Sequence, residues 1–68
     1  RAEFYIARSS VERIIGQTEL ALMDVEKAIE LEPENSNHYT LQSILLERLG
    51  KKEAAKQSRF KAAKYKNR

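Results

Sequence analysis

The sequence predicts an all-α chain in which two antiparallel helix-turn-helix hairpins stack on each other. Three observations predict this fold. Residues 19–32 contain no Gly, no Pro and few β-branched residues, so the helix is the conformation of lowest cost there. The apolar side chains of this segment cover an arc of roughly 200°, about twice what one neighbouring helix requires. The sequence also repeats itself with a period of 34 residues, and its 68 residues hold two copies.

The repeat places identical residues at equivalent positions in the two halves of the chain. A shift of 34 residues aligns Tyr5 with Tyr39, Ser9 with Ser43, Gly16 with Gly50, Glu19 with Glu53, Ala21 with Ala55, Lys27 with Lys61 and Ala28 with Ala62. We therefore expect residues 1–34 and residues 35–68 to fold as two similar units of a single domain, the second of which ends in a basic helix.

Four helices are expected, near residues 2–15, 18–32, 36–49 and 52–66. The turns between them fall at Gly16-Gln17, Pro33-Glu34-Asn35 and Gly50-Lys51. Pro33 ends the second helix because it has no amide hydrogen to donate, and Asn35 or Ser36 can cap the third helix. Turns this short make consecutive helices antiparallel neighbours.

The second helix organises the predicted fold. Its apolar arc consists of Leu20, Ala21, Leu22, Val25, Ala28, Ile29 and Leu31. An arc of this width indicates neighbours on both flanks, and the small Ala21 and Ala28 lie where a neighbouring backbone can come close. The core sides of the flanking helices are expected to be Phe4, Tyr5, Ala7, Val11 and Ile15 in the first helix, and Tyr39, Leu41, Leu45, Leu46 and Leu49 in the third.

The fourth helix has a narrower apolar arc, so we expect it to close the C-terminal side of the array. Its arc consists of Ala54, Ala55, Ala62 and Tyr65 and spans roughly 100°, enough for one neighbour. Phe60 lies outside this arc among lysines. The first helix shows no matching polar flank, so we expect its side to stay open. The isolated segment should then be marginally stable, or should bury this open flank by self-association or within a longer parent chain.

Together these features resemble the tetratricopeptide repeat, a 34-residue helix-turn-helix with Gly at the turn, small residues in the second helix and Pro after it. The matching residues are Tyr5, Gly16, Ala21, Val25, Ala28 and Pro33 in the first copy, and Tyr39, Leu46, Gly50, Ala55 and Ala62 in the second. The departures are Arg8, Ser9 and Glu12 in the first copy, and Arg59 and Asn67 in the second. The resemblance implies a fragment of an α-solenoid that acts as a protein-binding scaffold.

The resemblance also implies that a protein or peptide partner binds the concave surface, which the first helices of successive hairpins line. On this basis the partner-binding residues are Ile6, Ser10, Arg13, Ile14, Asn37, Thr40, Ile44, Glu47 and Arg48. Isoleucines among polar neighbours suit a polypeptide ligand. Alternatively, they cover the junction between the hairpins or contact a missing neighbour. Arg13 and Glu47 occupy equivalent columns, so they can pair across the repeats.

Some members of this family hold the acidic C-terminus of a peptide with Asn, Lys and Arg side chains. The resemblance places those positions on Ala7, Asn37 and Leu41, so the basic residues are missing here. We therefore do not expect this particular activity.

The positive charge is concentrated in the last part of the chain. Residues 51–68 hold eight of the 13 Lys and Arg residues and one acid, a net charge of +7, whereas residues 1–50 carry −4. Such a segment can bind nucleic acid or an acidic surface. Its basic residues surround the helix, however: Lys52, Lys56, Arg59, Lys61, Lys64, Lys66 and Arg68. We favour a solvated terminal helix, and keep as alternatives the binding of nucleic acid or an acidic surface by this helix and a purely structural capping role.

No pattern predicts an enzyme, a cofactor or a metal site. His38 is the one histidine and falls on the core side of its helix, where we expect a half-buried packing residue, and the chain has no Cys. Glu30, Glu32 and Glu34 end a helix without a base or a Gly-rich loop beside them, so we expect them to be solvated. No apolar run is long enough to cross a membrane. The lack of Cys does not decide the compartment. Because the chain begins at Arg1, we expect it to be a segment of a longer protein.

Overall fold

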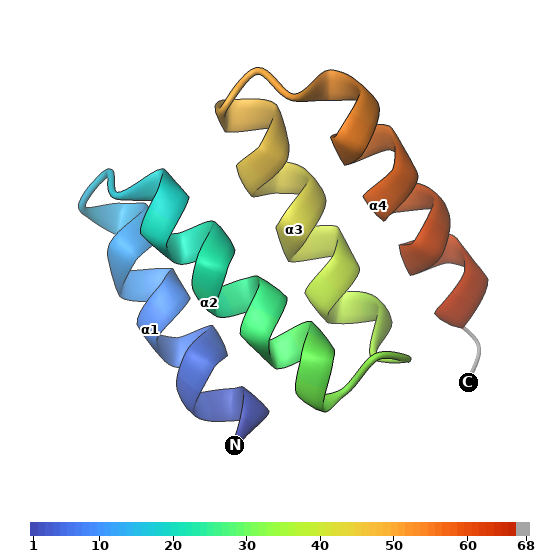
Figure 1. Ribbon diagram of the computed structural model, residues 1–68, viewed down its shortest axis with the longest axis horizontal. Coiled ribbons are helices and arrows are strands. Elements are labelled where there is room, and N and C mark those ends of the chain that lie inside the picture. The colour runs from blue at the N-terminus through green and yellow to red at the C-terminus, as the bar shows by residue number, and fades with distance from the viewer. Residues whose placement is uncertain (67–68) are drawn as a thin grey trace.

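The computed structural model describes residues 1–66, which form four helices and no strand. The helices are α1 (Ala2–Ile14), α2 (Thr18–Leu31), α3 (Ser36–Arg48) and α4 (Lys52–Tyr65), joined as two hairpins (Figure 1). Each helix ends one residue before the expected boundary, and the all-α fold of stacked hairpins is confirmed. Asn67 and Arg68, which entered the sequence comparison, lie outside the described residues.

The two hairpin turns are built alike. Gly16 and Gly50 have φ angles of +88° and +78°, a backbone region that glycine adopts without steric cost. The amide of Gln17 donates to the carbonyl of Glu12 at 2.7 Å, and the amide of Lys51 donates to the carbonyl of Leu46 at 2.9 Å. These bonds satisfy carbonyl groups that the end of a helix would otherwise leave unpaired, so α1 and α3 end by the same device.

A different turn joins the hairpins. α2 ends at Leu31, just before Pro33, and Asn35 caps α3 by accepting a hydrogen bond from the amide of Asn37 at 3.0 Å. The hydroxyl group of Tyr39 donates to the carbonyl of Pro33 at 2.5 Å. The turn is therefore tied both to the first turn of α3 and to the side of that helix.

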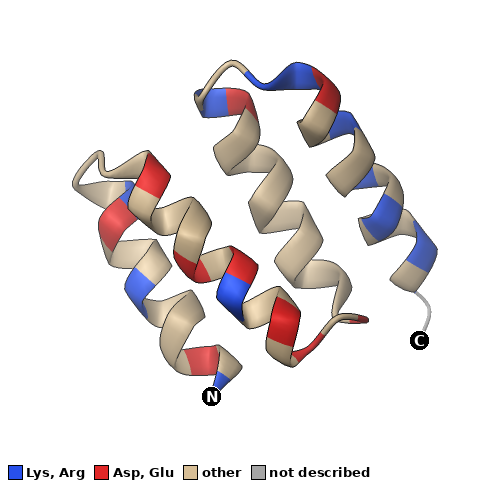
Figure 2. Cartoon of the chain, in the orientation of Figure 1, with Lys and Arg blue, Asp and Glu red and all other residues tan. Residues whose placement is uncertain are grey.

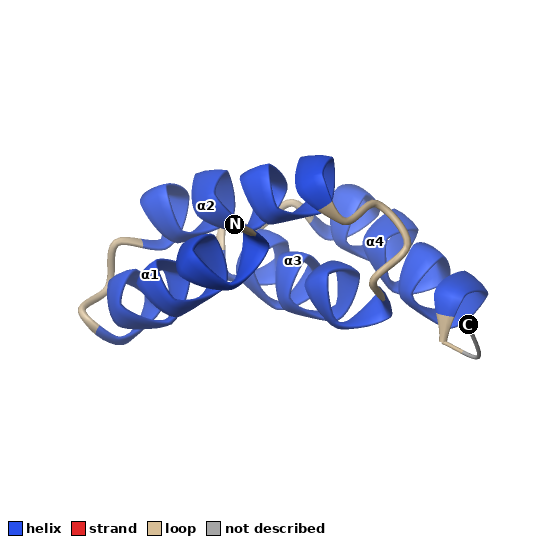
Figure 3. Cartoon of the chain, turned by 90° about the horizontal axis from the view of Figure 1, so that it is seen from below, coloured by secondary structure: helices blue, strands red, loops and turns tan. Residues whose placement is uncertain are grey.

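α2 packs against both α1 and α3, and α4 packs against α3. Viewed from below, α1 and α3 lie on one side of the molecule and α2 on the other (Figure 3). The buried core consists of Ala21, Leu22 and Val25 from α2, Leu45 and Leu46 from α3, and Ala55 from α4. The predicted two flanks of α2 are confirmed, and Ala21 and Ala28 are fully buried. Leu20 and Leu31, at the edge of the arc, remain about half exposed.

The predicted core side is correct for α3 and α4. Tyr39, Leu45 and Leu46 are buried, and Leu41 and Leu49 are half-buried against the same core. In α4, the narrow arc of Ala54, Ala55, Ala62 and Tyr65 is buried or half-buried. Phe60 lies outside that arc, as expected, and is 73% exposed.

The predicted core side of the first helix is wrong. Phe4, Val11 and Ile15 are 68%, 57% and 62% exposed, Ala7 is also exposed, and Tyr5 is half-buried. α1 instead buries Ala2 and Ser9, which lie on another side of the helix. The physical reason is the neighbour: α2 covers the equivalent side of α3, whereas within residues 1–66 no helix covers that side of α1.

A polar contact joins the two helices of each hairpin at the same place. In the first hairpin, Arg8 donates through Nε and Nη2 to the two carboxylate oxygens of Asp24, at 2.8 and 2.7 Å. The guanidinium group also lies over the ring of Tyr5, 5.6 Å from its centroid. In the second hairpin, a shift of 34 residues leads to Gln42 and Ser58, and the hydroxyl group of Ser58 donates to Oε1 of Gln42 at 2.7 Å.

Candidate partner-binding groove

Four of the predicted partner-binding residues line a groove of about 720 Å³ between α3 and α4. These residues are Asn37, Thr40, Ile44 and Glu47, all on the side of α3 that faces away from the core. α4 supplies the opposite wall with Arg59, Ala62, Ala63 and Lys66. The sequence predicted the wall on α3, whereas the wall on α4 depends on how the two helices approach each other.

The lining of the groove combines apolar and polar side chains. Ile44 is 45% exposed, and the small Ala62 and Ala63 leave space above it. The hydroxyl group of Thr40 donates to the carbonyl of Ser36 at 3.3 Å, so it is satisfied within its own helix. The side-chain amide of Asn37 has no hydrogen-bond partner within the described residues, and it can donate to or accept from a ligand backbone.

An ion pair spans the groove at one end. Nη1 of Arg59 on α4 donates to Oε2 of Glu47 on α3, and the two side chains are 51% and 53% exposed. The predicted pairing of Glu47 with Arg13 is therefore wrong, because α4 brings a closer cation from the same hairpin. Arg48 is exposed near the end of α3 and does not line the groove.

Of the predicted residues on the first hairpin, Ile6 lines a separate hollow of about 500 Å³, which α1 forms with the end of α2 and the start of α3. Ile6 is half-buried and packs against the core, and its carbonyl accepts a hydrogen bond from the hydroxyl group of Ser10 at 3.2 Å. Arg13 is half-buried, and its Nε atom is shielded from solvent with no hydrogen-bond partner among residues 1–66. Ile14 is 76% exposed. Ile6 therefore contacts the core and Ile14 lies at the surface, and the binding role of both stays a prediction.

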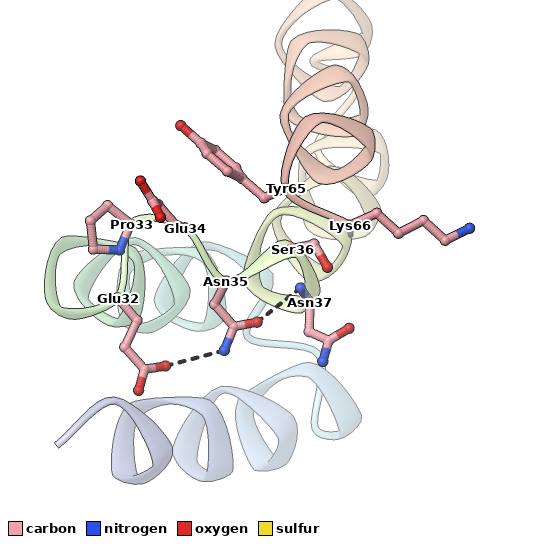
Figure 4. Close-up of a pocket in the computed structure, with 8 residues that line it drawn as sticks. All are labelled: Glu32, Pro33, Glu34, Asn35, Ser36, Asn37, Tyr65 and Lys66. Carbon is pink, nitrogen blue, oxygen red and sulfur yellow. Dashed lines mark hydrogen bonds between the residues drawn. The ribbon is translucent and has the colours of Figure 1, made fainter. Parts of the chain in front are cut away.

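A second hollow, of about 860 Å³, continues the groove past the inter-hairpin turn (Figure 4). It shares Ser36, Asn37 and Lys66 with the groove. At its edge the side chain of Asn35 donates to Oε1 of Glu32 at 3.2 Å while capping α3 (Figure 4). This hollow was not predicted from the sequence. The short turn before the capped start of α3 was the feature that indicated it.

The acidic end of α2 is not simply solvated. Nε2 of the buried His38 lies 2.8 Å from Oε1 of Glu32. The hydrogen bond with His38, followed by that from Asn35, lowers the pKa of the Glu32 carboxyl group. Glu32 is 51% exposed, in agreement with the expected solvation, and it is hydrogen-bonded as well. The packing role expected for His38 agrees with its burial, which is deeper than expected, and its ring also ties α3 to the end of α2.

Among residues 1–66, no group of three or more His, Cys, Asp and Glu side chains could hold a metal ion. The same part of the chain has no helix that could cross a membrane. The groove between α3 and α4 brings together the apolar Ile44, the side-chain amide of Asn37 and the Glu47–Arg59 ion pair.

Comparison with known proteins identifies the repeat. Residues 25–57, from the middle of α2 into α4, match the family model of the tetratricopeptide repeat. No curated protein and no solved structure matches the chain. The assignment of a further repeat to residues 1–34 stays a prediction, which rests on the period of 34 residues. From the all-α hairpins and the matched residues, we conclude that this chain carries a tetratricopeptide repeat.

Proposed function

We propose that the chain is a protein–protein interaction module that binds a peptide or a partner helix in the groove between α3 and α4. Tetratricopeptide repeats generally mediate protein–protein interactions and are typically non-enzymatic scaffold modules. The observation that carries the proposal is the position of Ile44. It is a large apolar side chain, 45% exposed, that lines the groove between the polar residues Thr40 and Glu47 of the same helix.

The groove gives each part of a peptide a different contact. An apolar side chain of the partner would lie on Ile44 and against the small Ala62 and Ala63, which removes apolar surface from water. The free amide of Asn37 would bond to the partner's backbone. The Glu47–Arg59 pair is half exposed and contributes about 1 kcal/mol or less, so charged groups of the partner can compete for it.

A random peptide library displayed on phage, selected on the 68-residue chain, tests the proposal. We expect the selected peptides to lose binding at least about tenfold with Ile44→Asp, because a carboxylate in the groove would lose solvation on binding. Arg59→Glu should also weaken binding, and Arg48→Glu should have a smaller effect because Arg48 lies outside the groove.

Met23→Asp is the matched control, since Met23 is an exposed apolar residue of α2 away from the groove. It should leave peptide binding unchanged. Equal binding by the unchanged chain and the Ile44→Asp variant, with helical circular dichroism retained in both, would refute the groove as the partner site.

The basic residues of α4 support a second candidate function, the binding of nucleic acid or an acidic protein surface. Acidic residues gather on the first hairpin and the inter-hairpin turn, whereas basic residues dominate α4 (Figure 2). The exposed lysines point in several directions around the helix and form no single stripe, so we rank this candidate second. The dependence of affinity on salt separates the two, because phosphate contacts make affinity fall steeply as salt rises.

A further inference from the structure

α1 carries an exposed apolar stripe that the proposed groove does not use. Phe4, Val11 and Ile14 are 68%, 57% and 76% exposed, and Ala7 lies exposed between them. These four residues are separated by three, four and three positions, which is the spacing of the a and d positions in a heptad. The spacing places them on one narrow line along the helix, suited to contact with one other helix.

α3 shows how the same side of a helix behaves when it is covered. Leu45, the counterpart of Val11, is fully buried in the core that α2 and α3 share. Leu41 and Leu49, the counterparts of Ala7 and Ile15, pack against that core. The side of α1 that carries the stripe therefore has the backbone geometry of a helix-packing surface, and a helix is the element that fits it.

We propose that this helix is α1 of a second copy of the chain, running antiparallel across a two-fold axis. An antiparallel pair centred level with residue 9 sets Phe4 of one copy opposite Ile14 of the other. The same register sets Ala7 opposite Val11, so a small residue meets a larger one. By symmetry each contact occurs twice, and the stripe is complementary to itself.

The charges on the molecule select α1 over α4 as the contact between copies. The outward side of α4 carries the exposed Lys56 and Lys64, so two α4 helices repel each other, and α4 set against the stripe would bury lysines. Arg8 lies beside the stripe on α1, but Asp24 of the same copy balances its charge. Pairing through α1 therefore buries no lysine, and its flanks carry the paired Arg8 on one side and the exposed Glu3 on the other.

The size of the contact indicates a weak dimer. A helix of 13 residues is about 20 Å long, so one pair of such helices buries less than the roughly 1,600 Å² of a standard interface. We therefore expect a dimer weak enough to dissociate on dilution. The dimer would leave the groove between α3 and α4 free, so its formation can be tested independently of peptide binding.

Sedimentation equilibrium of the 68-residue chain over a concentration series tests the proposal. We expect a monomer–dimer equilibrium that Val11→Asp or Ile14→Asp weakens at least about tenfold, because each variant places two carboxylates in the seam. Met23→Asp and Phe60→Asp, at exposed apolar residues of α2 and α4, should leave it unchanged. A chain that stays monomeric at millimolar concentration, or a dimer lost with Phe60→Asp, would overturn the proposal.

The register has its own test, because the chain has no cysteine of its own. Oxidation of a mixture of Ala7→Cys and Val11→Cys chains should cross-link mainly one chain of each kind. Cross-linked pairs of identical chains as the main product would contradict the antiparallel register. Helical circular dichroism checks every variant, and all substituted positions are exposed, so the fold should be retained.

Discussion

α1 and α3 begin their hairpins at equivalent positions and end in the same kind of turn, yet they bury different amounts of apolar surface. α3 lies between α2 and α4 and buries Tyr39, Leu45 and Leu46. Among the described helices, α1 packs extensively only against α2, and it buries the small residues Ala2 and Ser9. The same apolar pattern thus becomes core in one helix and surface in the other. The difference teaches that periodicity identifies a packing surface, while a neighbour decides whether that surface is buried.

The polar contacts that join the two helices of each hairpin lie at equivalent positions but differ in chemistry. Arg8 and Asp24 form a charged pair where Gln42 and Ser58 form a neutral hydrogen bond. Asp24 is buried, and a buried carboxylate without a partner would be costly, so Arg8 is the more important member of its pair for folding. The hydrogen bonds from Arg8 also lower the pKa of the Asp24 carboxyl group.

The largest expected difference between the hairpins follows from one equivalent pair of residues. Leu45→Ala should lower the free energy of unfolding by about 2–5 kcal/mol, because the side chain is fully buried. Val11→Ala should change it by about 0.5 kcal/mol or less, since the side chain is exposed. Urea unfolding followed by circular dichroism, at concentrations where the chain is monomeric, measures both. Equal losses would show that α1 is packed like α3.

The hairpin turns should respond alike, although the helices do not. Gly16→Ala and Gly50→Ala should each destabilise the chain by about 1–2 kcal/mol, because the left-handed backbone region is sterically unfavourable for alanine. No other atom lies within 4 Å of a β-carbon built at either site, so the cost is confined to the backbone. Thermal unfolding measures both variants. A loss at Gly50 without one at Gly16 would mean that the first hairpin unfolds separately.

Much of the fold could be predicted because its signals are local. Gly16, Gly50 and Pro33 mark the turns, Asn35 caps α3, and the wide arc of α2 required two neighbours. The core side of α1 could not be predicted in this way, because its burial depends on a helix outside the repeat itself.

The candidate site was partly predictable for the same reason. The side of α3 around Ile44 was identified from its own sequence, whereas the wall on α4 required the approach of two helices. Arg13 and Glu47 were paired because they are 34 residues apart and hold equivalent positions in the two repeats. In the structure Glu47 contacts Arg59 of its own hairpin instead. The Arg8–Asp24 pair was also missed, although both residues are polar on helix sides that face each other.

The polar seam of the first hairpin makes stability depend on pH in two opposite directions. A hydrogen bond with Asp24, and then burial, raise the pKa of the Glu12 carboxyl group, so its contribution is lost as the pH rises through that raised value. The lowered pKa of Asp24 acts the other way: its contribution is lost as the pH falls through the lowered value. The counterpart of Glu12 in the second hairpin is the buried Leu46, which does not titrate.

The smallest predicted effect is that of Glu12→Gln on thermal stability, which tests the titrating group that the first hairpin has and the second lacks. Glu12→Gln keeps a donor for Asp24 at every pH, so it should raise the thermal midpoint at neutral pH by about 3 °C or less. The gain should vanish in acid, below the pKa of Glu12, where the native carboxyl group carries its own proton. Glu26→Gln, at an exposed carboxylate elsewhere on α2, is the control and should show no such pH dependence. A Glu12→Gln variant whose midpoint differs from that of the unchanged chain by the same amount at all pH values would refute the raised pKa of Glu12.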